Sequence, residues 1–231
     1  MNTKAEQYVI ENLKKLSDAE YRLFHLKLMP TVEPDTVLGV RVPLIRNFAK
    51  EFLRTDMCRE FIENLPHTFY EENNLHTALL YNITDFNKLM GYIEAFLPHI
   101  NNWATCDMPL PKAFKTHKRE LLPYIKKWLR SKHIYTVRFA VKVLMDLFLD
   151  EDFSSKYLEW VANIKSNEYY INMMCAWYFA TALYKRPLET MPFIEAKCLP
   201  KFTHNKAISK SIESNRIPSA AKAYLKTLRI G

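Results

Sequence analysis

The chain has 231 residues, of which 48% are hydrophobic and 25% charged, and it carries a formal net charge of +8. This composition excludes a disordered chain, and the length allows one large or two small domains with a buried core. The three glycines, Gly39, Gly91 and Gly231, are too few for a hairpin-rich sheet protein, and no dinucleotide or phosphate-loop fingerprint can be assembled from them.

Helical periodicity runs through nearly the whole chain. In SDAEYRLFHLKLM, Ser17 and Glu20 have capping-box spacing, which predicts a helix start. Gly39 is expected in a turn that needs a positive φ, and Pro43 near the start of the next helix, where its missing N–H costs little. Further helices are predicted over residues 71–83, 86–97, 111–117, 120–130, 134–149, 152–164, 169–184, 188–197, 205–214 and 219–228.

Two segments indicate an internal repeat. SKHIYTVRFAVKVLMDLFLDEDF and SNEYYINMMCAWYFATALYKRPL each begin with serine and a short polar stretch, followed by aromatic residues and a long apolar helix. Arg138 and Trp177 occupy related places in them, 39 residues apart. Irregular repeats of about 35–45 residues are typical of stacked HEAT-like helix pairs, so we predict an all-α solenoid in a single domain over residues 1–231. Trp103, Arg138 and Trp177 are then expected to line one concave surface.

The positive charge is concentrated in two segments. Residues 112–142 hold ten lysines and arginines and one acid, Glu120, and residues 197–229 hold eight and one acid, Glu213. This asymmetry favours a polyanionic partner, with nucleic acid first and an anionic membrane surface second. An ordinary solvated helix surface is the alternative.

Cysteine placement and hydropathy limit the remaining classes. Cys58, Cys106, Cys175 and Cys198 form no Cys-x-x-Cys pair and do not cluster with histidines, so neither a metal site nor a cofactor is expected. The N-terminal MNTKAEQYVI has no signal-peptide core, and the longest uncharged run, residues 169–184, is short for a membrane span. We therefore expect a cytoplasmic monomer with reduced thiols and no membrane partner.

The stretch NNWATCD places Trp103 and Asp107 four residues apart, on one face if the stretch is helical. In one interpretation Asp107 caps a helix containing Pro109 and Pro111, and Trp103 is a core residue. In the other interpretation the two form a catalytic pair. That pair suits cleavage of an N-glycosidic bond, because a carboxylate stabilises the oxocarbenium-like sugar cation and positions the attacking water.

Four further side chains are candidates for DNA contacts. Trp177 lies in an almost uniformly apolar helix, so it either packs in the core or presents its indole to a cationic purine or its deoxyribose. Arg138 has mostly apolar neighbours, and its guanidinium either has an internal partner or binds phosphate. Lys206 and Lys210 are one helical turn apart and form either a phosphate-tracking face or a solvated one.

Four segments, in the same order and over most of the chain, resemble the AlkD-like family of DNA alkylation-repair glycosylases. GVRVPLIRNFAKEF is similar to the family's N-terminal signature, and WATCD to its Trp-x-x-x-Asp, which places Trp103 and Asp107 on catalytic positions. YTVRFAVKVLM resembles the segment with the DNA-contacting arginine, here Arg138. YYINMMCAWYFATAL resembles the segment with the second active-site tryptophan, here Trp177.

The resemblance implies a right-handed superhelix of HEAT-like repeats with a basic concave cleft. It also implies a monofunctional DNA glycosylase, which hydrolyses positively charged N3- or N7-alkylated purines from duplex DNA without flipping the base into a pocket. Trp103, Trp177 and Asp107 then contact the deoxyribose and backbone of the lesion. The alternative function is a non-catalytic HEAT-like module that binds DNA or serves as a scaffold, and such a module gains nothing from an acid facing phosphates.

Overall fold

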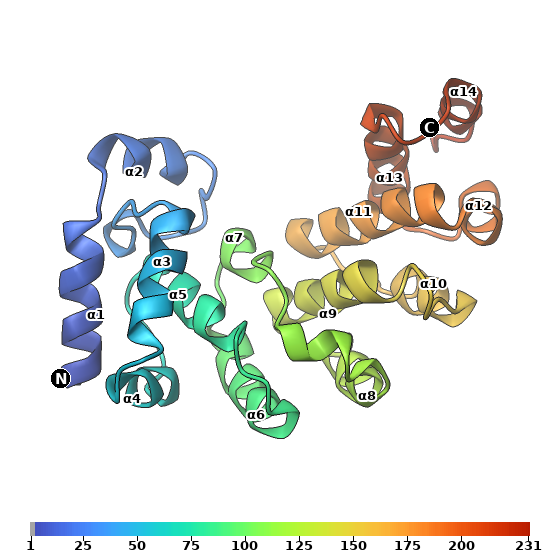
Figure 1. The fold of residues 1–231 in the computed structure, drawn as a ribbon. Helices are drawn as coiled ribbons and strands as arrows, with labels where there is room; N and C mark the ends of the chain where they lie inside the picture. Colours follow the sequence, from blue (N-terminus) through green and yellow to red (C-terminus); the bar gives the residue numbers. More distant parts are fainter. Residues whose placement is uncertain (1–2) are drawn as a thin grey trace. The chain divides into compact units, whose positions relative to one another are not determined.

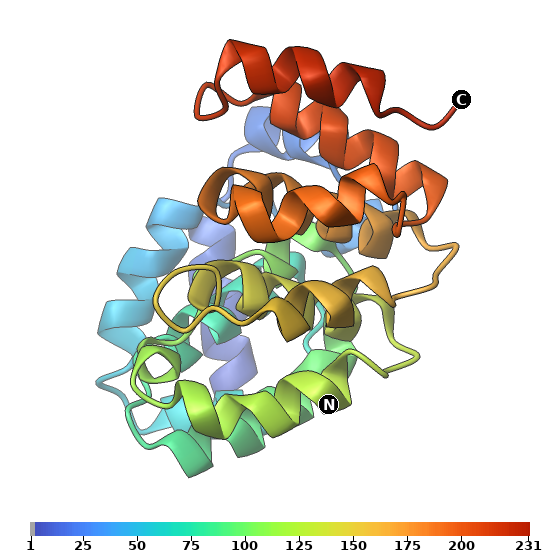
Figure 2. The same cartoon turned by 90° about the vertical axis from the view of Figure 1, so that its right-hand side faces the viewer.

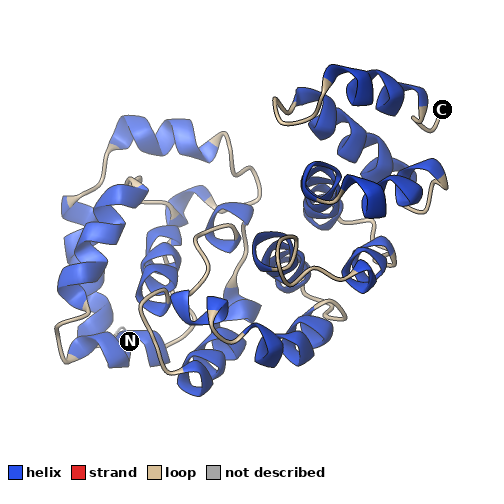
Figure 3. Cartoon of the chain, turned by 45° about the vertical axis from the view of Figure 1, so that its right-hand side comes forward, coloured by secondary structure: helices blue, strands red, loops and turns tan. Residues whose placement is uncertain are grey.

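The computed structural model describes residues 3–231, and this part of the chain contains 14 α-helices, three short 3-10 helices and no strand (Figure 3). The prediction of an all-α, helical-repeat fold is therefore confirmed. The chain divides into two compact units, one ending at Arg119 and the other running from Glu120 to Gly231. The single domain over residues 1–231 stays a prediction. No helix in the described part is both long and apolar enough to cross a bilayer.

The first unit is organised around one central helix, α5 (Figure 1). This helix packs against α1, α3, α4, α6 and α7, and ten of its 11 residues are buried. Several of these residues are polar, so they need hydrogen-bond partners inside the unit. The elements of the unit are α1 (Lys4–Lys15), α2 (Ala19–Leu26), η1 (Pro34–Thr36), α3 (Val42–Phe52), α4 (Met57–Glu63), α5 (Tyr70–Leu80), α6 (Phe86–Phe96), η2 (Leu97–His99), α7 (Trp103–Cys106) and η3 (Lys112–Lys115).

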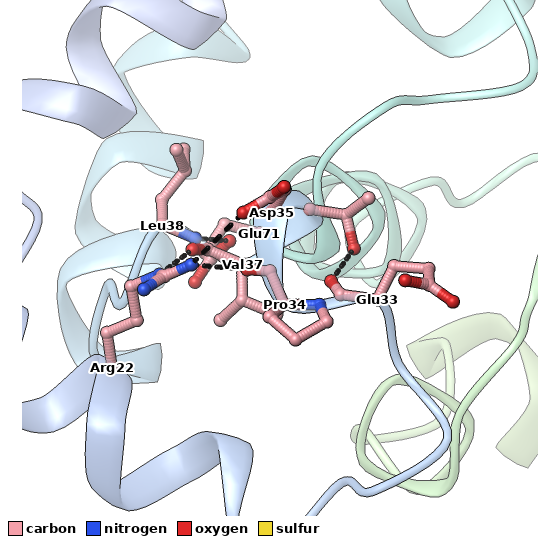
Figure 4. Close-up of polar contacts among 8 residues, drawn as sticks. Arg22, Glu33, Pro34, Asp35, Val37, Leu38 and Glu71 are labelled. Carbon is pink, nitrogen blue, oxygen red and sulfur yellow. Dashed lines mark hydrogen bonds and ion pairs between the residues drawn. The ribbon is translucent and has the colours of Figure 1, made fainter.

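Glu71 on α5 holds the loop that precedes α3 (Figure 4). Its side chain is buried, and its carboxylate accepts backbone N–H bonds from Leu38 at 2.9 Å, Gly39 at 2.7 Å and Val40 at 3.2 Å. Burial raises the pKa of Glu71, and the three backbone donors oppose that shift because they favour the charged carboxylate. The loop is thus attached to the central helix by one side chain.

The same loop needs a glycine at position 39. Gly39 has a φ of +87°, which confirms the predicted turn, and a Cβ there would lie 2.5 Å from the Asp18 carbonyl oxygen. Arg22 on α2 braces the loop by donating to the carbonyl oxygens of Val37 and Pro34, each at 2.6 Å (Figure 4). Side chains from two helices therefore hold the chain just before α3 begins.

The start of α2 differs by one residue from the predicted start. Asp18, and not Ser17, is the N-cap, and its carboxylate accepts the Tyr21 N–H at 2.9 Å. Ser17 instead donates its hydroxyl to the Lys14 carbonyl, at the end of the preceding helix. The predicted start of α3 is confirmed, with Pro43 in its first turn.

In the second unit the helices α9, α11 and α13 form a stack, in which each helix packs on the next but one in the chain. α11 packs between α9 and α13, and α14 packs on α13 (Figures 1 and 2). α10 and α12 pack against each other and against α11. Such nearest-neighbour stacking is the arrangement of helical-repeat proteins. The elements are α8 (Lys118–Trp128), which crosses the division between units, α9 (Ile134–Leu147), α10 (Ser155–Ala162), α11 (Tyr169–Lys185), α12 (Pro187–Glu195), α13 (Lys201–Glu213) and α14 (Ser219–Thr227).

The repeat predicted from the two serine-led segments is present as two turns of the same design. Before α9, the His133 N–H donates to Ser131 Oγ at 3.0 Å, and before α11, the Glu168 N–H donates to Ser166 Oγ at 3.0 Å. His133 and Glu168 are the N-caps of these two helices. The serine in each segment therefore shapes the turn from which a long helix starts.

Candidate active site

The Trp103–Asp107 pair lies at α7, a short helix that a buried polar network attaches to α5. Asn102 caps the helix by accepting the Thr105 N–H at 2.8 Å. The Thr105 hydroxyl donates to Asn74 Oδ1 on α5 at 2.9 Å. Asn102, Thr105 and Asn74 are all buried, and buried hydrogen bonds of this kind hold an element in one position.

Trp103 is the first residue of α7 and is half-buried. Its indole N–H donates to the Leu28 carbonyl at 3.0 Å. Its ring packs against a cluster of buried side chains, Met29, Val32, Val37 and Tyr70. Burial raises the pKa of Tyr70 to about 12, so this cluster carries no phenolate near neutral pH. One hydrogen bond and one apolar contact surface therefore fix the indole, and part of it stays accessible.

Asp107 follows α7 as its C-cap and is half-buried. Its backbone N–H donates to the Trp103 carbonyl at 2.9 Å, so the two residues are one helical turn apart, as predicted. The helix predicted over residues 111–117 is the short 3-10 helix η3. The N-cap of η3 is Pro111, and no side chain caps it. The interpretation of Asp107 as an N-cap of that helix is therefore wrong.

A basic hollow of about 270 Å³ lies beside the end of α7. Met108, the residue after Asp107, lines it together with Arg46, Lys50 and Lys112. Lys112 also lies over an aromatic ring, that of Tyr81, at 4.9 Å from the centroid. Lys112 begins the first basic segment of the sequence, whereas Arg46 and Lys50 lie outside both basic segments. The spacing of Arg46 and Lys50, four residues apart on α3, was the available signal.

Trp177 on α11 is 40% exposed, so its interpretation as a core residue is wrong. It lines an open hollow of about 300 Å³ together with Tyr184, Lys210 and Arg216. The Arg216 guanidinium lies 5.2 Å from the centroid of the Tyr184 ring. Glu213 is the one carboxylate in the lining, so the two cations leave a net positive charge beside the exposed indole. Such a surface can bind an anionic backbone and present an aromatic face at the same time.

Arg138 on α9 is only 6% exposed, and its Nη1 donates to the Tyr170 carbonyl at the start of α11 at 2.8 Å. The internal partner considered for Arg138 is therefore present, and its contact with DNA stays a prediction. The N-caps of α9 and α11 are 35 residues apart, whereas Arg138 and Trp177 are separated by 39. The two residues therefore occupy places that differ by one helical turn within the repeat.

Lys206 and Lys210 both lie on α13 but line different hollows. Lys210 lies beside Trp177. Lys206 is exposed and lines a separate hollow with Phe202 and Arg229. Its Nζ is 5.9 Å from the centroid of the Phe202 ring. Within each unit, the structure therefore brings Trp103 to Asp107 and Trp177 to Lys210. Lys206, one turn before Lys210 on α13, lines a different hollow.

Comparison with known protein families supplies the remaining observation. The family model of DNA alkylation repair enzymes matches residues 9–211, which is most of the chain. The chain belongs to this DNA alkylation repair enzyme family. Membership in the family implies that the protein acts in DNA repair and has DNA as its partner. The matched region includes Trp103, Asp107, Arg138, Trp177, Lys206 and Lys210, whereas Arg216 and Arg229 lie beyond it. A search of curated proteins found no match to the chain.

Proposed function

We propose that the protein is a monofunctional DNA glycosylase that hydrolyses the N-glycosidic bond of positively charged N3- or N7-alkylated purines in duplex DNA. The observation that carries this proposal is the pairing of Trp103 and Asp107 across one helical turn, within a DNA alkylation repair family match. A carboxylate in a basic, DNA-binding protein weakens phosphate binding. It is useful where positive charge develops during a reaction.

The proposed chemistry needs only this chain's side chains, water and DNA. As the bond between C1′ and the purine nitrogen breaks, its electron pair leaves with the cationic base and neutralises it. Positive charge then develops on the sugar, where Asp107 stabilises it and orients the water that attacks C1′. The water then loses one proton to bulk solvent, and its hydroxyl remains on C1′ of the abasic sugar. Trp103 and Trp177 contact the deoxyribose and backbone of the lesion. The base is not flipped into a pocket, because its own charge already weakens the bond.

In the proposed complex, cations position the duplex by binding its phosphates. Lys206 and Lys210 are assigned this role on α13, and the resemblance adds Arg138. Because Arg138 is largely buried and bonded to the Tyr170 carbonyl, it also connects α9 to the helix that carries Trp177. No metal or cofactor enters the proposal.

The direct test is the release of free 7-methylguanine and 3-methyladenine from methylated duplex DNA. We expect time-dependent release of both bases by the wild-type protein, leaving abasic sites without strand cleavage, as for a monofunctional enzyme. Binding of the same duplex without release of either base would instead establish the non-catalytic HEAT-like module.

The two tryptophans are expected to respond differently to truncation. Trp177→Ala removes an exposed indole, so it should cost about 1–2 kcal/mol of unfolding free energy, below the roughly 3–5 kcal/mol of a core tryptophan. It should nevertheless slow excision by roughly tenfold or more, because an aromatic contact with the deoxyribose, on which positive charge develops, is lost. Trp103→Ala should lower both the unfolding free energy and the rate of excision, since its ring packs on buried side chains and donates a hydrogen bond.

Chemical denaturation and single-turnover excision, measured on the same preparations, separate these effects. Tyr169→Ala is the matched control for Trp177, because Tyr169 is an exposed aromatic residue of the same helix. Equal excision by Trp177→Ala and Tyr169→Ala would remove Trp177 from the proposed site.

A further inference from the structure

A second basic hollow, separate from the residues proposed above, lies between the turn before α9 and the turn before α11. Its volume is about 580 Å³. Four cations line it, Lys126, Arg130, Lys132 and Lys165, against one carboxylate, Glu168. None of the tryptophan, aspartate or lysine side chains of the proposed site contributes to its lining.

The two turns around this hollow are well defined. They are the matching serine turns of the repeat, in which Ser131 and Ser166 each accept a backbone N–H at 3.0 Å. The second turn is tied further to α11, because Asn172 donates its side-chain amide to the Ser166 carbonyl at 2.9 Å. Both serines line the hollow. Lys132 and Lys165 therefore lie beside turns that backbone and side-chain hydrogen bonds hold in place.

The four cations have no carboxylate partner within ion-pair distance anywhere in residues 3–231. Lys126 has an aromatic partner instead, with its Nζ 5.0 Å from the centroid of the Trp160 ring. Lys142 and Lys185 in the same unit show the contrast, since each is paired with an aspartate. Four cations against the single carboxylate of Glu168 leave an excess of positive charge, and its potential attracts an anion.

We infer that this hollow binds backbone phosphates of the DNA duplex flanking the lesion. The inference rests on the proposed function only in taking duplex DNA as the ligand. The arginine fork of Arg130 matches phosphate oxygens, and the lysines and serine hydroxyls supply further donors. The volume accommodates a phosphate with its sugar. The hollow is thus an anchoring surface that adds affinity without taking part in bond cleavage.

The test is the triple variant Arg130→Gln/Lys132→Gln/Lys165→Gln, titrated with undamaged duplex DNA at several salt concentrations. We expect the slope of log affinity against log salt to become shallower by about 2–3, with affinity at least about tenfold weaker at low salt, because each lost phosphate contact removes counterion release. Excision at saturating DNA should be unchanged. All three side chains are exposed, so thermal unfolding should also be unchanged.

The matched control is Lys4→Gln/Lys14→Gln/Lys15→Gln, which removes the same net charge from exposed positions on α1. If the salt slope of the test variant equals that of this control, the effect comes from net charge alone and the inference is overturned. Inorganic phosphate, exchanged for chloride at constant ionic strength, tests the other source of phosphate. One result would overturn the inference: phosphate raises the melting temperature of the wild type but not of the triple variant, while the two proteins bind duplex DNA equally well.

This design separates the inference from the proposed function. Binding of undamaged DNA does not depend on excision. A shallower slope in the triple variant of a protein that releases no base would retain the phosphate site and reject the glycosylase. Base release by the wild type, together with an unchanged salt slope in the triple variant, would retain the glycosylase and reject the phosphate site.

Discussion

Asp107→Asn is expected to slow base excision by at least about a hundredfold, which corresponds to roughly 2.7 kcal/mol of lost transition-state stabilisation. The amide has nearly the shape of the carboxylate but carries no charge to oppose the developing sugar cation. Folding should change little, because asparagine keeps the size of the side chain and one oxygen that accepts hydrogen bonds. DNA binding should be retained or slightly strengthened, since a negative charge near phosphates is removed.

Single-turnover release of alkylated base from saturated protein is the appropriate measurement, because weaker binding then cannot imitate lost chemistry. Asp85→Asn is the matched control. Asp85 caps α6 in the same unit by accepting the Lys88 N–H at 3.0 Å, a bond that asparagine can also make. Excision by Asp107→Asn at the rate of this control would make the carboxylate structural and favour the DNA-binding module.

Glu71→Ala is expected to cause the largest loss of stability, at least about 3 kcal/mol of unfolding free energy. The substitution leaves the buried N–H groups of Gly39 and Val40, and the partly buried one of Leu38, without their acceptor. The loop also contributes Val37 to the cluster on which Trp103 packs. Loss of the carboxylate should therefore loosen the support of the candidate catalytic residue as well.

Urea unfolding measures this effect, and Glu33→Ala is its control. Glu33 is an exposed carboxylate near the same loop, and its truncation should change stability by no more than about 0.5 kcal/mol. Glu71→Gln tests the importance of charge, because it retains one acceptor oxygen but turns an NH₂ group towards backbone donors. If Glu71→Ala and Glu33→Ala lose similar amounts of unfolding free energy, water replaces the Glu71 carboxylate without cost and the prediction is wrong.

Where a single residue gave an unambiguous signal, the sequence predicted the start of a helix correctly. Gly39 and Pro43 identified the turn and start of α3, because a positive φ and a fixed φ are properties of single residues. Ser17 and Asp18 are neighbouring cap candidates, and the tertiary structure selects the second. The prolines before residue 112 left only a short 3-10 helix where a longer helix was predicted. Helices α1 and α4 were not predicted, although Thr3 and Glu6 form a capping box at the start of α1.

The candidate site was predictable as a set of residue types and not as an arrangement. The spacing of Trp103 and Asp107 is local, so the sequence predicted their helical turn correctly. The apolar sequence around Trp177 has no polar face, so periodicity did not show that its indole is exposed. The burial of Arg138 depends on the Tyr170 carbonyl, which comes from another helix. The second basic hollow combines two turns whose residues are distant in the sequence.

The exposure of Trp177 also makes the protein's own fluorescence informative. Of the four tryptophans, Trp128 is buried and Trp103 and Trp160 are partly buried, whereas Trp177 is 40% exposed. An indole in contact with water emits at longer wavelength than one in apolar surroundings. Covering the hollow beside Trp177 with a nucleic-acid strand excludes water from that ring, and a stacked base quenches its emission. The long-wavelength part of the spectrum therefore reports occupancy of this hollow without an added label.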